Sequence, residues 1–483
     1  MTGFNAQPHQ GNRIMDKKLI DRFIEIVGVN HALVDQDVIS SYLVEQRGLY
    51  HGRTPLVLRP SSPQEVSEIM KLASETLTPI VPQGGNTGLV GAQQPDESAN
   101  EIIVSMERLN RIRSIDVEGN LALVEAGVVL HTLQEKVDEK GRFFPLSLGS
   151  EGSCQIGGNL SSNAGGTDVL AYGNTRELCL GLEVVLPDGR ILDDLRYVKK
   201  DNSGYDLKDL FIGAEGTLGI ITAAVMKLFP KPQGKAVAYA GMKSPEKALE
   251  LLLLAQKKAG SMLTGFELMA KVGMEMSLNY VKGARAPIEH ESEWYVLLDL
   301  SSSHSDGEAE NTMEDILADA LQQGVIEDAS IARSVSQQKE FWRLREDMSP
   351  AQKLEGGSIK HDISVPIASI PDFISEAAKI IETISPGARI VCFGHMGDGN
   401  LHYNVSQPVG ADKQAYLSLW GEMNHRIHTL VVSYNGSFSA EHGIGQLKRK
   451  ELVAFKSPVA LSLMRSIKQV FDPKNIMNPG KML

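Results

Sequence analysis

Two histidines lie on either side of a glycine-rich turn in the segment Phe393–Asn404. Apolar, β-prone residues flank the tetrapeptide Gly397–Asn400, whose Gly, Asp and Asn residues tolerate the positive φ angles of a tight turn. The pattern predicts a β-hairpin in which His395 lies directly opposite His402. Because directly opposed Cβ atoms of antiparallel strands are about 5 Å apart, the two imidazoles could share one divalent metal ion.

A carboxylate and an amide can join this pair of histidines. Asn404 lies two residues beyond His402 and therefore points to the same face of the strand. Further along the chain, Glu441 and His442 stand between small residues. Two histidines and one carboxylate with an open position form a catalytic metal set that suits zinc best and also admits manganese, cobalt or iron. The alternative is a pair of ordinary strand histidines, which the convergence of several polar side chains disfavours.

Composition and charge narrow the class of protein. The chain has 483 residues, of which 42% are hydrophobic and 22% charged, enough for two or three domains with sizeable cores. A formal net charge of −12 gives no electrostatic support to nucleic-acid binding. Cys154, Cys179 and Cys392 are too scattered for a disulfide framework or a CxxC site, and we expect buried, inert thiols.

The sequence offers neither a membrane span nor a signal peptide. No apolar run approaches the length that crosses a bilayer, and residues 1–16 are polar and expected to form a disordered tail. We therefore expect a protein that is not integral to a membrane and works in the cytoplasm, or in the mitochondrial matrix if the source is a eukaryote.

The order of strand-like and helix-like segments predicts an α+β fold with several units. Ser62 is placed to cap a helix over residues 63–74, and residues 102–105 have the composition of a strand. The expected units are a helical segment at 17–52, a β-rich domain at 53–232, an α+β domain at 233–425 that contains the hairpin, and a C-terminal segment at 426–483.

Two glycine clusters stand in the β-rich block, at Pro82–Gly91 and Gly152–Gly166. Consecutive glycines let backbone amides turn toward an anion such as a phosphate. Neither cluster is a GxGxxG motif that opens a helix or a Walker A loop, so a Rossmann fold is not expected. One such run is usually a tight turn. Two dense clusters in one block favour a large, neutral-walled cofactor site with a pyrophosphate.

Several ordered motifs resemble a known family. Pro82–Gly88, Ile156–Gly166 and Gly213–Thr222 are similar to the FAD-binding domain of the vanillyl-alcohol-oxidase type, also called PCMH-type. The hairpin from His395 to His402, Ala440–Gly443 and Asn478–Lys481 resemble its D-lactate and D-2-hydroxyglutarate dehydrogenase branch. The match runs from about Arg53 to the C-terminus. It implies a two-part FAD-binding domain, an α+β substrate (cap) domain, and a C-terminal segment that returns to the FAD domain and completes the active site.

The resemblance implies non-covalent FAD, because Asn86 stands near the place where many members of the fold family attach the flavin to a histidine. The residues that it places at the cofactor are Pro82, Gly84, Gly85, Asn86, Thr87, Gly88, Leu89, Gly152, Ser153, Gly157, Gly158, Asn163, Gly165, Gly166, Glu215, Gly216, Ile221 and Asn478.

The resemblance also implies a site for a second carboxylate of the substrate. In D-2-hydroxyglutarate dehydrogenases an Arg, a Thr four residues later and a Lys hold the distal carboxylate. Here Arg345, Ser349 and Lys360 match that spacing, with Ser in place of Thr. We expect Trp342–Ser349 to be helical, so that Arg345 and Ser349 share one face. Arg343 is the competing candidate if the helix register differs. For each cation taken alone, the alternative is an ordinary solvated residue at the protein surface.

A reaction follows from the resemblance. A D-2-hydroxy acid would lose its α hydrogen as hydride to flavin N5, with a metal ion on His395, His402 and Glu441 at its hydroxyl and C1 carboxylate. His442 would be the general base and also contact substrate, and Asn404 would bind the C1 carboxylate. The leading hypothesis is oxidation of D-2-hydroxyglutarate to 2-oxoglutarate. The alternatives are a D-lactate or broader D-2-hydroxy acid dehydrogenase, and a metal-binding or flavin-storing protein without turnover.

The sequence leaves the partners of such an enzyme open. An electron-transfer flavoprotein, a quinone or a cytochrome would each serve as electron acceptor, and a homodimer is compatible with the sequence.

Overall fold

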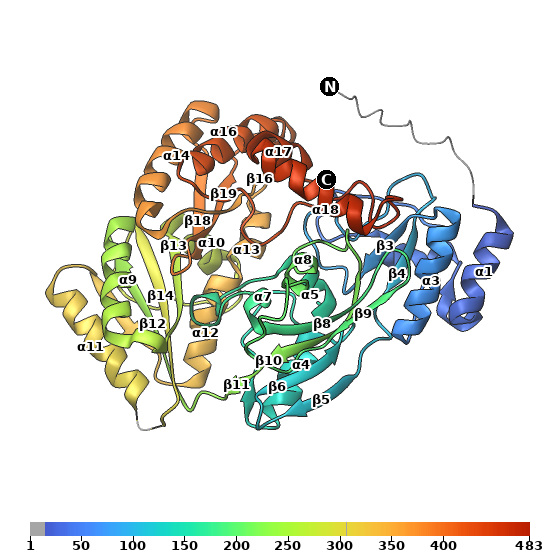
Figure 1. Cartoon of the computed structure of the whole chain (residues 1–483). Coiled ribbons are helices and arrows are strands. Elements are labelled where there is room, and N and C mark those ends of the chain that lie inside the picture. Colours follow the sequence, from blue (N-terminus) through green and yellow to red (C-terminus); the bar gives the residue numbers. More distant parts are fainter. Residues whose placement is uncertain (1–14, 306) are drawn as a thin grey trace.

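The computed structural model describes residues 15–305 and 307–483, which form two lobes (Figure 1). The first lobe contains the chain up to about residue 230, and the second contains most of the remainder. The predicted tail at 1–16 lies outside the described residues except for Met15 and Asp16, and Asp16 is the N-cap of helix α1 (Lys17–Val27). None of the described helices is both long and apolar enough to cross a membrane.

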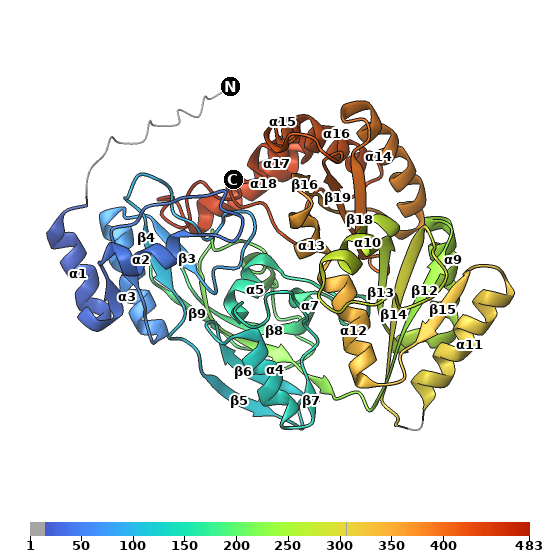
Figure 2. The same cartoon turned by 180° about the vertical axis from the view of Figure 1, so that it is seen from behind.

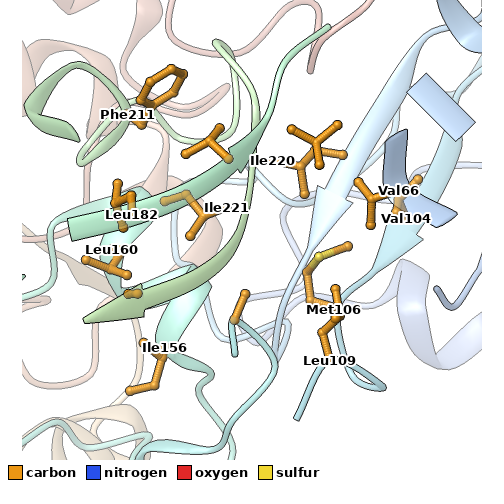
Figure 3. Packing of buried hydrophobic residues seen from close by; sticks show 14 of the residues in the cluster. Val66, Val104, Met106, Leu109, Ile156, Leu160, Leu182, Phe211, Ile220 and Ile221 are labelled. Carbon is orange, nitrogen blue, oxygen red and sulfur yellow. The ribbon is translucent and has the colours of Figure 1, made fainter. Parts of the chain in front are cut away.

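Two main sheets contribute to the core of the first lobe. One has the order β1 (Ala32–Leu33), β2 (Val57–Leu58), β4 (Ile102–Ser105), β3 (Ile80–Gln83), of which β2, β4 and β3 are parallel. The other is antiparallel, with the order β5 (Ile112–Asp116), β6 (Leu121–Glu125), β10 (Ile220–Lys227), β8 (Cys179–Val185), β9 (Ile191–Asp194). Figure 3 shows part of this core, where Val104 comes from the first sheet and Leu182 and Ile220 from the second.

Short helices and a strand pair complete the first lobe. They are α2 (Gln36–Leu43), α3 (Pro63–Thr76), α4 (Leu130–Asp138), α5 (Ile156–Ser162), α6 (Val169–Tyr172), α7 (Thr175–Leu178), α8 (Lys208–Phe211), β7 (Arg142–Phe143) and β11 (Phe229–Pro230).

Helix α3 illustrates how local sequence determines these elements. The hydroxyl of Ser62 accepts the N–H of Glu65 at 3.1 Å, and Pro63 stands in the first turn, where its missing N–H removes no helical hydrogen bond. Val66 and Ile69 recur at helical spacing and are fully buried. The helix predicted over 63–74 and the strand predicted over 102–105 are therefore confirmed.

One antiparallel sheet organises the second lobe, with helices on both faces (Figures 1 and 2). Along β12, Ala236, Ala238 and Ala240 enter one core, whereas Val237 and Tyr239 enter the core on the opposite face. The strand order is β15 (Asp328–Ile331), β12 (Gly234–Met242), β14 (Trp294–Ser302), β13 (Leu263–Ala270), β18 (Arg389–His395), β19 (Asn400–Ser406), β16 (Ser358–Ile359), and β17 (Asp362–Ser364) also pairs with β19.

The helices of this lobe separate by face. Those that pack on the alanine side of β12 are α9 (Pro245–Ala259), α11 (Glu308–Gln322), α14 (Ile370–Ile384) and α16 (Trp420–Ser433). Those on the other side are α10 (Lys271–Tyr280), α12 (Val335–Glu346) and α13 (Met348–Leu354), while α15 (Lys413–Leu417) adjoins the first set. The expected boundary at residue 425 falls inside α16, so the second core continues to Val431.

The C-terminal segment returns to the first lobe through α17 (Arg449–Phe455) and α18 (Pro458–Phe471). Met477 bridges to Ile80 in parallel, so that the segment after α18 lies along the edge of β3. Lys481 forms a buried ion pair with Glu101 at 3.0 Å. The last residues are thereby fixed beside the first glycine cluster.

Candidate active site

Strands β18 and β19 form the predicted hairpin, but in a different register. His402 pairs with Phe393 and not with His395, so the predicted pairing was wrong by two residues. An even shift leaves each side chain on its expected face, because strand side chains alternate with a period of two. The two histidines are diagonal neighbours, and their ring centroids are 5.7 Å apart.

The cause of the shift lies in the turn, which spans Met396–Gly399 instead of Gly397–Asn400. The carbonyl of His395 accepts two N–H groups of the turn, at 3.1 and 3.2 Å, and closes it one residue early. Gly399 has a φ of +90°, and a Cβ there would lie 2.5 Å from the carbonyl oxygen of Val365. The neighbouring strand therefore helps to select this turn.

His395, His402 and Glu441 bring their ligand atoms within 4.8 Å of one another. Oε1 of Glu441 lies 3.4 Å from Nε2 of His395, and its Oε2 lies 3.8 Å from Nε2 of His402. Burial lowers the pKa of His402 to about 4, so its imidazole is neutral at neutral pH. A neutral imidazole and a carboxylate are donors that a divalent cation accepts.

Glu267, a residue that the sequence did not indicate, fixes the ring of His395. Its side chain is fully buried on β13, where Oε1 accepts Nδ1 of His395 at 2.6 Å and Oε2 accepts Nε of Arg345 at 2.7 Å. Burial alone would raise the pKa of Glu267, but the charges of His395 and Arg345 hold it near 2. This carboxylate–histidine pair turns Nε2 of His395 toward Glu441. A single carboxylate in an otherwise apolar strand was the available signal.

Asp362 performs a similar task for the loop that carries Glu441 and His442. Its Oδ2 accepts the backbone N–H groups of both residues, at 3.0 and 2.9 Å, and lies 3.3 Å from Nδ1 of His442. Burial opposes ionisation of Asp362, yet His442 and Lys448 hold its pKa below the usual range. Burial lowers the pKa of His442 to about 4, which leaves a neutral imidazole oriented through Nδ1.

Lys360 and Ser349, two of the residues assigned to the distal carboxylate, lie in contact. Nζ of Lys360 donates to the hydroxyl of Ser349 at 2.8 Å. Burial, and then the charges of Arg47 and Lys353, lower the pKa of Lys360 to about 8. The predicted helix over 342–349 is interrupted, because α12 ends at Glu346 and α13 begins at Met348.

Arg345 already contacts other side chains of the protein. Besides its bond to Glu267, its guanidinium lies 4.7 Å from the ring centroid of Phe393. Its Nη atoms make no hydrogen bond with any residue that the structure describes. The competing candidate Arg343 is exposed and bonded to the carbonyl of Lys282. Asn404 is buried and donates one amide hydrogen to Gln352 at 3.1 Å.

A cavity of about 530 Å³ lies against both glycine clusters. The implied cofactor residues that line it are Pro82, Gly84, Gly85, Asn86, Thr87, Gly88, Leu89, Gly157, Gly158, Gly165, Glu215, Gly216 and Ile221. Ser349, Glu441 and His442 line the same cavity. Ser349, Glu441 and His442 therefore face the same space as the glycine loops.

Five implied cofactor residues lie outside this lining, and they position its wall. Gly152 and Ser153 are exposed, and a Cβ on Gly85 would lie 2.0 Å from the carbonyl oxygen of Ser153. The others cap or join neighbouring loops. Asn163 accepts the N–H of Arg176, Gly166 approaches the carbonyl of Ser147, and Asn478 donates to the carbonyls of Ala92 and Glu215.

The lining suits a large ligand with many polar atoms. Oε1 of Gln93, Oε1 of Gln155 and Nδ2 of Asn159 are buried there without a hydrogen-bond partner among the described residues. Buried polar atoms usually have partners, so these amides fit a ligand that supplies them. A Cβ on Gly158 would project into open space, which lets a ligand approach the backbone closely.

Known proteins give an independent comparison. Residues 54–194 match the family described as FAD binding domain, and residues 231–482 match that described as FAD linked oxidases, C-terminal domain. The fold is similar to that of p-cresol methylhydroxylase, with a TM-score of 0.76 and 16% identity over 96% of each chain. It is also similar to alkyldihydroxyacetonephosphate synthase, with a TM-score of 0.72 and 17% identity over 98% of this chain and 86% of that one.

Closer relatives are known by sequence. The chain is 36% identical to the mitochondrial D-2-hydroxyglutarate dehydrogenase of Arabidopsis thaliana, over 97% of this chain and 82% of that protein. It is 37% identical to the protein of the same name from Bos taurus (95% and 82%) and 34% identical to a putative mitochondrial D-lactate dehydrogenase of Schizosaccharomyces pombe (95% and 89%). The chain therefore belongs to the FAD-linked oxidases with the vanillyl-alcohol-oxidase type of fold, in the branch that contains the D-2-hydroxyglutarate and D-lactate dehydrogenases.

Proposed function

We propose that this protein is a FAD-dependent dehydrogenase that oxidises D-2-hydroxyglutarate to 2-oxoglutarate and uses a divalent metal ion. The observation that carries the proposal is one shared cavity. Ser349, Glu441 and His442 line the same space as the glycine loops of the FAD-binding domain. A hydroxy acid held by the first group would therefore lie beside a flavin held by the second. The names of the relatives support this substrate class.

His395, His402 and Glu441 would hold the metal ion, and zinc suits two imidazoles and one carboxylate best. The carboxylates of Glu267 and Glu441 raise the pKa of His395 well above its usual value, against the effect of burial. A metal ligand must be deprotonated, so binding of the cation releases a proton from His395. Glu267 then keeps the ring in place through Nδ1.

Residues of this chain transfer the proton and bind the substrate. When bound, FAD accepts a hydride and the metal ion supplies a Lewis acid. His442 takes the proton of the substrate hydroxyl at Nε2, because Asp362 occupies the side of Nδ1. Lys360 and Ser349 hold the distal carboxylate, and the second amide hydrogen of Asn404 reaches the C1 carboxylate.

A second candidate is a D-lactate or broader D-2-hydroxy acid dehydrogenase. The observation that favours it is the hydrogen bond from Nε of Arg345 to Glu267 at 2.7 Å. This bond neutralises part of the positive charge of Arg345 that would otherwise attract a distal carboxylate. A relative named putative D-lactate dehydrogenase is consistent with this candidate.

Anaerobic reduction of the bound flavin tests both candidates. The purified protein is mixed with D- and L-2-hydroxyglutarate and with D- and L-lactate, and flavin absorbance is followed. Bleaching fastest with D-2-hydroxyglutarate supports the proposal, and equal rates with D-lactate support the second candidate. A flavin that no hydroxy acid reduces would contradict both and leave a flavin-storing protein.

Turnover also requires an electron acceptor. An electron-transfer flavoprotein, a quinone and a cytochrome remain the three proposed classes, and reoxidation of the reduced enzyme by each compares them directly.

The relatives are named mitochondrial, and we propose the mitochondrial matrix for a eukaryotic source and the cytoplasm otherwise. A homodimer is also proposed, and light scattering of the purified protein tests it.

A further inference from the structure

The loop Val44–His51, from the N-terminal helical segment, forms part of the cavity wall. Val44 and His51 form an antiparallel bridge at its base. The carbonyl of Val44 accepts the amide of Asn86 at 2.8 Å, which attaches the loop to the first glycine cluster. Gln46 lines the cavity together with Ser349, Glu441 and His442. The loop is thus a neighbour of Ser349, Glu441 and His442, all of which lie in distant parts of the sequence.

Arg47 follows Gln46 directly and is half-buried. Glu45, which is 2% exposed, shapes the loop by accepting the backbone N–H of Arg47 at 2.6 Å and that of Leu49. Throughout the described ranges 15–305 and 307–483, the guanidinium of Arg47 makes no hydrogen bond or salt bridge. A guanidinium carries five donors, and leaving them partly buried without acceptors is unfavourable.

The electrostatic neighbours of Arg47 are the residues of the substrate site. After burial, its charge makes the largest contribution that lowers the pKa of Lys360 to about 8. It also contributes to the lowered pKa values of His442 and Lys448. The carboxylates whose charges act on Arg47 are Asp362 and Glu45, and each already accepts two backbone N–H groups.

Several positively charged side chains act on one another on this side of the cavity. Lys353, which lines the cavity, adds a third cation to Arg47 and Lys360. Within the part of the chain that the structure describes, Nζ of Lys360 donates a hydrogen bond only to the neutral hydroxyl of Ser349. Because these cations repel one another, an anionic ligand bound among them relieves the repulsion.

We infer that Arg47 is a substrate-binding residue whose guanidinium binds the distal carboxylate of a dicarboxylic substrate beside Lys360 and Ser349. The inference rests on the proposed function and deepens it, because it makes the N-terminal loop a determinant of specificity for dicarboxylates. A planar guanidinium can bind that carboxylate through two parallel hydrogen bonds, which a lysine cannot do.

The test compares Arg47→Met with Arg47→Lys and with a control, Arg53→Met, which removes an exposed arginine two residues beyond the loop. kcat/KM is measured with D-2-hydroxyglutarate and with D-lactate, which has no distal carboxylate. We expect Arg47→Met to lower kcat/KM roughly tenfold or more for the diacid only, since one charge-assisted hydrogen bond has about that effect. Arg47→Lys should lie between wild type and Arg47→Met, and Arg53→Met should equal wild type.

A binding measurement separates this inference from the proposed function. Glutarate cannot be oxidised at C2, and its binding is followed through the flavin spectrum of the holoenzyme. Weaker glutarate binding by Arg47→Met, with unchanged FAD content and melting temperature, supports the inference even if wild type oxidises neither acid. Equal glutarate binding by Arg47→Met and wild type, or equal loss of activity with both acids, overturns it. Failure of wild type to oxidise any hydroxy acid refutes the proposed function instead.

Discussion

At the scale of single residues, two buried carboxylates hold the other side chains of the site in place. Glu267 joins His395 to Arg345, and Asp362 joins His442 to the backbone of the loop that carries Glu441. Each is buried and ionised against the effect of burial, because positive groups or N–H donors surround it. Removing one partner of such a cluster leaves the others without compensation.

Glu267→Gln should weaken metal binding. The amide keeps the size of the side chain but cannot polarise Nδ1 of His395, and loss of such an orienting carboxylate lowers metal affinity about 10- to 100-fold. Metal content after titration with a chelator measures the effect. Glu101→Gln is the matched control, because Glu101 is also a buried, ion-paired carboxylate but pairs with Lys481. Equal metal affinities of Glu267→Gln and wild type would contradict the assigned role.

Lys360 predicts a pH dependence that differs between substrates. Its pKa is lowered to about 8, so Nζ is charged below that pH and neutral above it. kcat/KM for D-2-hydroxyglutarate should therefore fall as the pH rises through about 8, and kcat/KM for D-lactate should show no such fall from this residue. Lys360→Arg keeps its charge at every accessible pH and should lose the alkaline limb. Identical pH profiles for both acids would exclude Lys360 from the distal carboxylate.

At the scale of elements, short helix α6 connects the two lobes at the hairpin of β18 and β19. It packs against β13, the strand that carries Glu267. A Cβ on Gly397, in the hairpin turn, would lie 2.6 Å from Cδ2 of Leu170 on α6. The residue before α6, Asp168, has a pKa raised to about 7 by burial and then by the charge of Asp299. Lys235, Glu267 and His395 also act on it.

Asp168→Asn should change the pH dependence of stability. The raised folded-state pKa means that wild type binds one proton more when folded than when unfolded between about pH 4 and 7, so its stability falls as the pH rises through that window. The amide does not titrate. Relative to wild type, the variant should gain roughly 1–3 kcal/mol of unfolding free energy from pH 4 to pH 8. Urea unfolding at several pH values measures this gain, and parallel curves would refute it.

At the scale of the whole molecule, distant segments meet around one cavity. The glycine loops come from the first lobe, Ser349 comes from the second, and Glu441 and His442 come from the segment that returns to the first lobe. Met477 lies along β3, and Asn478 donates to the carbonyl of Glu215 in the wall. Chain connectivity in both directions thus closes the cofactor site.

The flavin should leave the denatured protein. Asn86 carries an amide in place of a nucleophilic imidazole, and that amide is bonded to Val44 and Gln94. We therefore expect acid precipitation to release all FAD to the supernatant, where its absorbance is measured against the pellet. A pellet that stays yellow, or a fluorescent band on a denaturing gel, would show a covalent bond.

Much of this architecture is determined by local sequence. The cap at Ser62, the strand at 102–105 and the hairpin around the turn follow from propensities and periods of neighbouring residues. The alternation of β18 and β19 was enough to place His395 and His402 on one face even though their register was predicted wrongly. All three cysteines are buried, as their spacing and neighbours predicted.

Only the tertiary structure decided which charges meet at the site. The hairpin turn packs against Val365, whose close approach to Gly399 no local pattern encodes. One polar residue in an apolar strand or a loop leaves only a weak signal in the sequence. Glu267 is 128 residues from His395, Arg47 is farther still, and Asp362 is brought to His402 by the pairing of β17 with β19. Their positions follow from sheet pairing and from the packing of two lobes, because convergence across hundreds of residues is a property of the folded core and not of any short segment.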